Sequence, residues 1–79
     1  MKLQWTEHAQ KSMRKYMADQ VGINTVNVAV AALTDDPEPP EAFIRGRYHR
    51  LRVGPYRVQY TIDGDIIAIL RVDRVLADR

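Results

Sequence analysis

Apolar and polar side chains alternate along two segments of the chain, YHRLRV and YRVQYTI, which are separated by Gly54-Pro55. A period of two is typical of half-buried β-strands, and two such runs joined by Gly-Pro predict a β-hairpin. If Gly54 and Pro55 form its loop, Arg52 lies opposite Arg57 and Arg50 lies opposite Gln59. Residues opposite each other share a face of the sheet, so the pattern predicts one arginine side and one apolar side.

Arg50, Arg52 and Arg57 are expected to project together from this hairpin. The apolar side is predicted to carry Leu51, Val53, Tyr56, Val58 and Tyr60. Like charges placed opposite each other are destabilising. The pattern therefore indicates a polyanionic partner, either a phosphate backbone or an acidic protein segment.

A second hairpin is predicted at Asp63-Gly64, which is a strong signal for a two-residue loop. It joins YRVQYTI to the apolar segment DIIAILRV. The register that follows is Val58 beside Ile69, Tyr60 beside Ile67, Arg57 beside Leu70 and Gln59 beside Ala68. Arg74 is expected at the edge of the arginine side, where the last strand leaves the sheet.

The first half of the chain predicts one short strand and two helices. KLQW, residues 2–5, alternates like a strand, and Thr6 can cap a helix that runs from Glu7 to about residue 20. Gly22 is expected to end this helix as a C-cap. Asn24 or Thr25 can then cap a second helix that runs to about residue 33.

The acidic, proline-rich segment 35–41 cannot continue a helix, and we interpret it as a linker to the sheet. The resulting order, β-α-α-β-β-β, predicts a single α+β domain over residues 1–79. In this fold a two-helix hairpin packs on one face of a small antiparallel sheet. The arginines then occupy the opposite face.

Charge is distributed unevenly over the 79 residues, whose formal net charge is +2. Residues 1–41 carry −2 and residues 42–79 carry +4, and a basic half is typical of proteins with nucleic-acid or acidic partners. The chain has no cysteine and only two histidines, so we expect no metal site and no cofactor. No apolar run is long enough to span a membrane, which favours a cytoplasmic location.

Several segments together resemble the RelE/ParE superfamily of toxins, and within it the RelE-like branch of type II toxin–antitoxin systems. These segments are DDPEPP, the RG before the hairpin, LRVGPYRVQY and DGDIIAILRVDR. The resemblance implies a RelE-like fold of the microbial ribonuclease type. It also implies a ribosome-dependent, metal-free endoribonuclease that cuts mRNA and is neutralised by a cognate antitoxin. Operator DNA would be bound only through the antitoxin complex.

The same resemblance assigns roles to individual residues. The catalytic arginines carried over from the family are Arg57, Arg50 and Arg74, and Arg57 matches best because its YR-x-x-Y pattern is intact. The surrounding candidates for substrate binding are Arg45, Arg47, Tyr48 and Arg52. Arginine can stabilise the charge that develops on a phosphate, but its permanent protonation makes it a poor general base. His49 has a suitable pKa range for a base, but the alternation places it on the apolar side beside Tyr60.

Three departures from the family pattern leave other functions open. Tyr48 and Arg50 stand where well-studied members have two lysines, Asp73 precedes Arg74 where members often have histidine or lysine, and no tyrosine follows Tyr60. The alternatives are a ParE-like inhibitor of DNA gyrase and a catalytically degenerate toxin that acts only as an antitoxin-binding co-repressor. Neither of these needs an acid–base pair.

Overall fold

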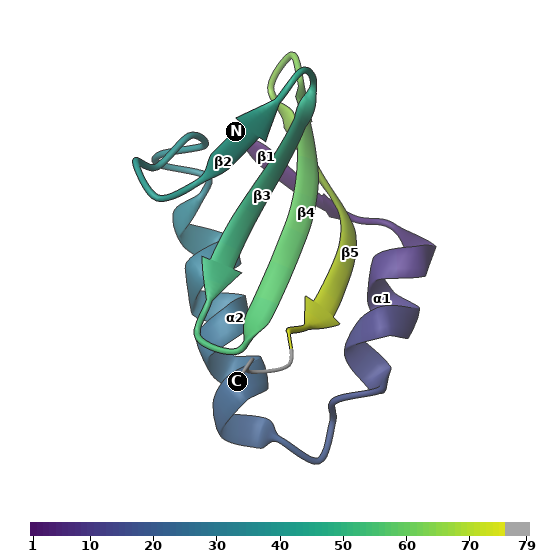
Figure 1. Ribbon diagram of the computed structural model, residues 1–79. Helices are drawn as coiled ribbons and strands as arrows, with labels where there is room; N and C mark the ends of the chain where they lie inside the picture. The colour runs from purple at the N-terminus through teal and green to yellow at the C-terminus, as the bar shows by residue number, and fades with distance from the viewer. Residues whose placement is uncertain (76–79) are drawn as a thin grey trace.

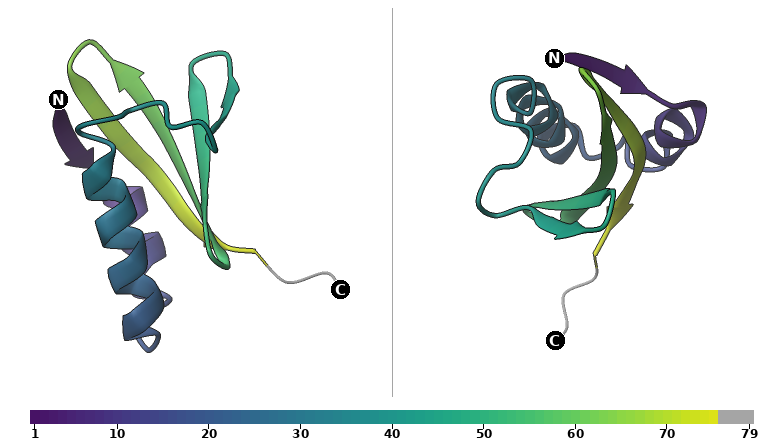
Figure 2. Two further views of the ribbon diagram at one scale, coloured as in Figure 1. Left: turned by 90° about the vertical axis from the view of Figure 1, so that its left-hand side faces the viewer. Right: turned by 90° about the horizontal axis from the view of Figure 1, so that it is seen from above.

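The computed structural model describes residues 1–75, which form two helices beside one twisted sheet (Figure 1). The strands are β1 (Lys2–Trp5), β2 (Phe43–Arg45), β3 (Tyr48–Val53), β4 (Tyr56–Asp63) and β5 (Ile66–Arg74), and the helices are α1 (Glu7–Arg14) and α2 (Gln20–Ala32). Their order within the sheet is β1-β5-β4-β3-β2. The predicted α+β class and the helical pair on one side of the sheet are confirmed (Figure 2).

Two features of the sheet differ from the prediction. β1 pairs parallel with β5, so the sheet is mixed rather than antiparallel throughout. The short strand β2 was not predicted, because its three residues, FIR, are all exposed and do not alternate in burial. β2 pairs antiparallel with β3 and forms one edge of the sheet.

The hairpin of β3 and β4 has the predicted register. Arg52 pairs with Arg57, Arg50 pairs with Gln59, and Gly54 adopts a left-handed φ of 58° in the loop. The side chains predicted to be apolar and buried on this hairpin are Leu51, Val53, Tyr56, Val58 and Tyr60, and all of them are buried. The alternating pattern of the sequence therefore does separate two faces.

The hairpin of β4 and β5 has a different register from the predicted one. Asp63 pairs with Ile66, so the loop begins one residue later than expected, and a β-bulge opposite Gln59 and Tyr60 skips Leu70 in the pairing. The observed pairs are Tyr60 with Ile69, Gln59 with Arg71, Val58 with Val72, Arg57 with Asp73 and Tyr56 with Arg74. Each of the predicted pairs is therefore wrong, although the same strands are joined.

The predicted cap at Thr6 and the predicted end of the second helix near residue 33 are confirmed, since α2 ends at Ala32 with Leu33 as its C-cap, but the other helix boundaries differ. The Thr6 hydroxyl accepts a hydrogen bond from the Ala9 N–H at 3.1 Å, so this residue is the N-cap of α1 as expected. α1 ends at Arg14, before the predicted end near residue 20. The N-cap of α2 is Asp19, whose carboxylate accepts the N–H of Gly22 at 3.0 Å.

Gly22 lies in the first turn of α2 and is not a C-cap, and Asn24 and Thr25 lie inside the helix. A glycine is needed at position 22 because α2 lies close to the sheet there. A Cβ at this position would lie 2.7 Å from a ring carbon of Tyr56. The Tyr56 hydroxyl donates a hydrogen bond of 2.6 Å to Asp19. Close contact with the sheet therefore decides where α2 begins.

α1 runs along the part of β5 that β1 does not reach. Three side chains from the N-terminal half satisfy backbone groups on this edge of β5: the Thr6 hydroxyl donates to Ile69 O at 2.8 Å, Ser12 Oγ accepts from Val72 N at 3.0 Å, and Tyr16 Oη accepts from Arg74 N at 3.2 Å. An open strand edge invites pairing with other chains, and here a helix covers it.

α2 covers the apolar face of the sheet with Ile23, Val26, Val30 and Leu33, all of them buried. The linker at residues 35–41 is tied to the same side by polar contacts. Tyr60 Oη donates to Pro37 O at 2.7 Å, and His49 Nε2 lies 2.7 Å from Glu38 Oε2. His49 stacks on the Tyr60 ring at 5.0 Å, which confirms its predicted place on the apolar side.

Candidate nucleic-acid interface

The face of the sheet opposite α2 carries most of the arginines, and we call it the arginine face. It is formed by Phe43 and Arg45 of β2, Tyr48, Arg50 and Arg52 of β3, Arg57 and Gln59 of β4, and Arg71 and Asp73 of β5. The predicted clustering of Arg50, Arg52 and Arg57 is confirmed by the register of β3 and β4.

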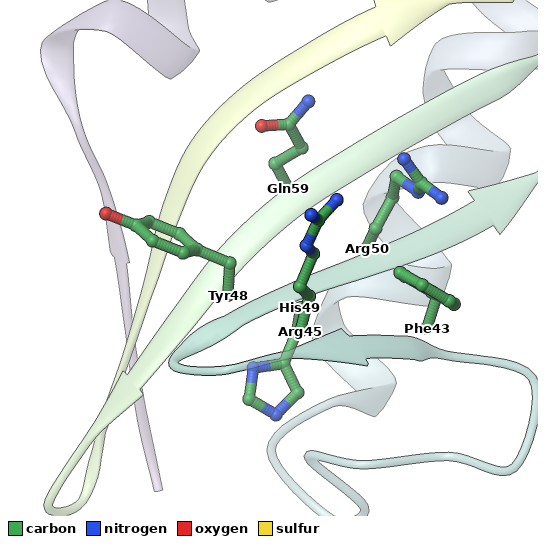
Figure 3. Close-up of a pocket in the computed structure, with 6 residues that line it drawn as sticks. All are labelled: Phe43, Arg45, Tyr48, His49, Arg50 and Gln59. Carbon is green, nitrogen blue, oxygen red and sulfur yellow. The ribbon is translucent and has the colours of Figure 1, made fainter.

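A shallow cavity of about 230 Å³ opens on the arginine face near β2 (Figure 3). It is lined by Phe43, Arg45, Tyr48, His49, Arg50 and Gln59. Phe43 is 53% exposed and Tyr48 is 56% exposed, and the guanidinium carbon of Arg50 lies 4.8 Å from the centroid of the Phe43 ring. Exposed aromatic rings beside guanidiniums are the groups on which unpaired nucleobases stack.

His49 contributes little to this cavity beyond its place in β3. Figure 3 shows its imidazole pointing away from the side chains of Arg45, Arg50 and Gln59. The side chain is only 5% exposed and is held by Glu38 on the other side of the sheet. It is therefore not placed to exchange protons with a ligand on the arginine face.

A second hollow of about 220 Å³ adjoins the first and shares Phe43 and Arg50 with it. Its lining consists of Glu41, Phe43, Arg50, Arg52 and Arg57. A guanidinium presents a rigid fork of N–H donors that matches the oxygens of a phosphate. The hollow thus brings three such forks to one place, next to the aromatic cavity.

Asp73 is the functional candidate that the sequence prediction missed. Its Oδ1 accepts a hydrogen bond of 2.7 Å from Arg71 Nε, and its Oδ2 lies 3.8 Å from Arg57 Nη2. The Asp73 side chain is 20% exposed, and Arg57 Nε is buried without a hydrogen-bond partner among the described residues. This carboxylate therefore partly neutralises two arginines. The register placed Leu70 beside Arg57, so no acidic neighbour was expected there.

Arg74 does not lie at the edge of the arginine face, and that prediction is wrong. It pairs with the buried Tyr56, and its guanidinium carbon lies 5.7 Å from the centroid of the Tyr56 ring. The hydrogen bond from Tyr56 to Asp19, helped by the Gly22 N–H and the charge of Arg74, lowers the pKa of Asp19 although burial opposes it. Arg50 and Arg57 thus share one hollow, and Arg74 belongs to a polar cluster on the other side.

The remaining predicted binding residues lie around the aromatic cavity. Arg45 and Tyr48 line it, and Arg52 lines the adjoining hollow. Arg47 lies in the turn between β2 and β3, with its guanidinium carbon 5.9 Å from the centroid of the Tyr48 ring. The structure therefore groups these residues, and their roles in binding stay predictions.

Metal-binding groups and membrane-spanning helices are both absent from residues 1–75. Among residues 1–75, no group of three or more histidine, aspartate or glutamate side chains is placed to hold a metal ion. Neither of the described helices is long and apolar enough to cross a membrane.

Comparison with known proteins identifies the family. Residues 3–75 match the family model described as the ParE toxin of the type II toxin–antitoxin system parDE. No relative was found among curated proteins.

Among solved structures, a chain of the chromosomal ParDE toxin–antitoxin system from P. aeruginosa is 20% identical with a TM-score of 0.79, and the match covers 96% of this chain and 97% of that one. The toxin–antitoxin complex RelBE2 from Mycobacterium tuberculosis contains a chain that is 26% identical with a TM-score of 0.68, covering 92% of this chain and 95% of that one. The chain belongs to the ParE toxin family of type II toxin–antitoxin systems, within the RelE/ParE superfamily.

Proposed function

We propose that this toxin is a ribosome-dependent, metal-free endoribonuclease that binds mRNA on the arginine face. The observation that supports it best is the pair of adjoining hollows. One presents exposed Phe43 and Tyr48 rings and the other presents Arg50, Arg52 and Arg57. Aromatic rings that can stack bases lie beside guanidiniums that can bind phosphates. This arrangement suits a single-stranded RNA better than a protein surface.

The proposed reaction uses the ribose 2′-OH as the nucleophile on the adjacent phosphate: its oxygen bonds to phosphorus, the bond from phosphorus to the 5′-oxygen of the next nucleotide breaks, and that oxygen leaves with a proton. Arg57 is the second residue of β4, and its backbone is paired with Arg52 of β3 and Asp73 of β5. The sheet therefore fixes the point from which its guanidinium reaches the phosphate as charge develops there. Arg50 and Arg52 bind the same phosphate or its neighbour, and Phe43 and Tyr48 stack the flanking bases. Arginines make poor general bases, so the proposal assigns the proton transfers to solvent and ribosomal groups.

Inhibition of DNA gyrase is the second candidate function. The family model that matches the chain is that of ParE toxins, and the arginine face carries no lysine or histidine side chain among its described members. A gyrase inhibitor needs cations for contact and no acid–base pair. The arginine face would then bind protein or DNA without cutting RNA.

A cognate antitoxin is the expected partner under either function. Chains similar to this one occur in a ParDE toxin–antitoxin system and in a RelBE2 toxin–antitoxin complex. Growth inhibition by the toxin alone, and its relief by a co-expressed neighbouring gene product that co-purifies with it, would support this partner. A toxin that inhibits growth equally with and without that product would contradict it.

The two functions are separated by one pair of assays on the purified toxin. Cut sites are mapped on mRNA bound to programmed ribosomes, and supercoiling by gyrase is measured in parallel. The proposal expects cuts that need the ribosome, persist with a metal chelator and occur without any effect on gyrase. Loss of supercoiling without RNA cuts would instead establish inhibition of DNA gyrase as the function.

A further inference from the structure

Helix α1 and its C-cap, Lys15, present a row of basic side chains beside the arginine face. His8, Lys11 and Lys15 are spaced three and four residues apart, which places them on one side of a helix. All three are exposed, and they line a cavity of about 270 Å³ together with Ser12 and Arg71. We call His8, Lys11 and Lys15 the α1 stripe.

The α1 stripe is connected to the aromatic cavity by a row of side chains that crosses the sheet. Phe43 pairs with Arg50, Arg50 pairs with Gln59, and Gln59 pairs with Arg71. Paired residues share a face, so this row leads from β2 to β5 on the arginine face. Neighbouring strands are about 4.8 Å apart, which puts the backbones at Arg50 and Arg71 roughly 10 Å from each other.

The contact between α1 and β5 is what continues this row beyond the sheet. β1 covers β5 only at residues 66–69, and Ser12 then accepts the N–H of Val72 directly after Arg71. The α1 stripe therefore begins where the row of paired side chains ends. The helix is fixed in this position by its hydrogen bonds to β5.

The two lysines of the stripe are available to a ligand. No carboxylate lines the cavity between α1 and Arg71, and neither Lys11 nor Lys15 forms an ion pair with another described residue. Glu7, one turn before Lys11, does not come within ion-pair distance of it. Arg71 donates a hydrogen bond from Nε to Asp73, so its two terminal nitrogens can still donate to a ligand.

We propose that the α1 stripe is a second phosphate-binding site, which holds the part of an RNA strand that leaves the aromatic cavity across Arg71. This inference rests on the function proposed above and adds a direction to it, because the strand would cross β3, β4 and β5 rather than follow them. Lysines on flexible stems bind phosphates as point charges, without reading the bases. The stripe would thus add affinity that is independent of sequence.

The test uses 2′-O-methyl RNA, which lacks the nucleophile and cannot be cleaved, in lengths of about four and about twelve nucleotides. Fluorescence anisotropy measures the affinity of the unaltered protein and of the double variant Lys11→Gln/Lys15→Gln at several salt concentrations. The matched control is Arg14→Gln, which removes a cation of the same helix outside the cavity lining. Lys11, Arg14 and Lys15 are all exposed, so folding is expected to persist in these variants and is checked by circular dichroism.

The longer RNA is expected to bind the double variant about tenfold more weakly, with a salt slope smaller by about 0.7 for each lost phosphate contact. The shorter RNA, which fits the aromatic cavity alone, should bind both proteins equally, and Arg14→Gln should change neither affinity by more than about twofold. Unchanged binding of the longer RNA, or an equal loss in the control, would overturn the inference.

Two other outcomes are distinguishable from these. Failure of the unaltered protein to bind either RNA would overturn the inference alone, because the proposed function is tested separately by cleavage on programmed ribosomes. Tighter binding of duplex DNA than of RNA, with the same dependence on Lys11 and Lys15, would overturn the assignment to an RNA strand.

Discussion

The two faces of the β3–β4 hairpin are made by alternate residues of the same two strands, yet they are built by opposite rules. On the side covered by α2, Tyr56 and Tyr60 are fully buried, and each hydroxyl has a hydrogen-bond partner. On the arginine face, Arg52 stands directly opposite Arg57, and the nearest carboxylate to Arg57 is 3.8 Å away. The tyrosine hydroxyls of the buried face find their hydrogen-bond partners within the chain, whereas the arginine face has more positive than negative charges.

This difference separates stability from binding at neighbouring positions. Changes on the buried face should lower the free energy of unfolding, because they remove packing or leave a polar group unpaired. Changes on the arginine face should alter RNA binding or cleavage with little effect on folding, because like charges opposite each other do not stabilise a sheet. Variants on the two faces should separate these effects, and the largest is expected at Arg57.

Arg57→Ala is expected to slow RNA cleavage by a hundredfold or more. Removal of one fixed donor to a developing negative charge costs about 2.7–4 kcal/mol in other enzymes. Arg57→Lys should also lose much of the activity, because an ammonium group cannot replace the two-pronged contact of a guanidinium. Cleavage is measured on programmed ribosomes, and urea denaturation of both variants should match that of the original protein. An unaltered cleavage rate in a folded Arg57→Ala protein would show that this residue is not catalytic.

Tyr60 should make the fold sensitive to alkali. Burial, with help from the charges of Glu38, Asp36 and Glu41, raises the pKa of Tyr60 to about 12 from its usual value of 10.0. The folded state then keeps a proton that the unfolded state releases above pH 10, so stability is fully present below about pH 10 and is lost as the pH rises to about 12. The loss should reach about 2–3 kcal/mol.

Tyr60→Phe is the control for this titration, since it lacks the phenol. It should be less stable at neutral pH by about 1 kcal/mol, because Pro37 O loses its hydrogen bond. Its stability should fall less steeply than that of the original protein between pH 10 and 12. Equal slopes in urea denaturation at these pH values would show that Tyr60 does not cause the alkaline loss.

Gly22→Ala is expected to destabilise the protein by about 1–3 kcal/mol, in the range of overpacked cores. In most helices this change would be favourable by up to about 1 kcal/mol, but here the added methyl group would press on the Tyr56 ring and on Asp19. Asn27→Ala, at an exposed position of the same helix, should be neutral or slightly stabilising. A stabilising effect of Gly22→Ala would mean that α2 can move away from the sheet without cost.

Asp73→Asn should have the smallest effect, which is a modest increase in RNA affinity. It removes the carboxylate that lies between Arg57 and Arg71, so uncleavable RNA should bind about two- to fivefold more tightly, which matches the modest strength of exposed ion pairs. Anisotropy titrations at low and high salt measure this change. Weaker binding would indicate that Asp73 orients the two arginines instead of competing for them.

Strand patterns that repeat along the sequence were predicted well, and single irregularities were not. The alternation around Gly54-Pro55 gave the correct register and the correct burial of Tyr56 and Tyr60. The bulge that skips Leu70 has no signature in the residue pattern, and it reverses the facing of every later side chain in β5. For that reason Arg74 was expected on the arginine face and lies on the other one.

The start of α2 could not be predicted from local sequence signals either. Asn24 and Thr25 are good capping residues, and Gly22 is a common end of a helix. Asp19 is chosen because its carboxylate is also bound by Tyr56, a residue 37 positions away along the chain. A contact at that distance depends on the folded sheet, and local pattern reasoning does not contain it.

The parallel pairing of β1 with β5 has a consequence for the order of events during synthesis. Thr6 and Ile69, which are joined by a hydrogen bond, are 63 positions apart. At a translation rate of about 5–20 residues per second, roughly 3 to 13 s pass between their additions to the chain. The nascent chain must therefore wait with an unpaired first strand, while the local β3–β4 hairpin can already form. The sheet can therefore be completed only after β5 has left the exit tunnel, because β5 lies between β1 and β4.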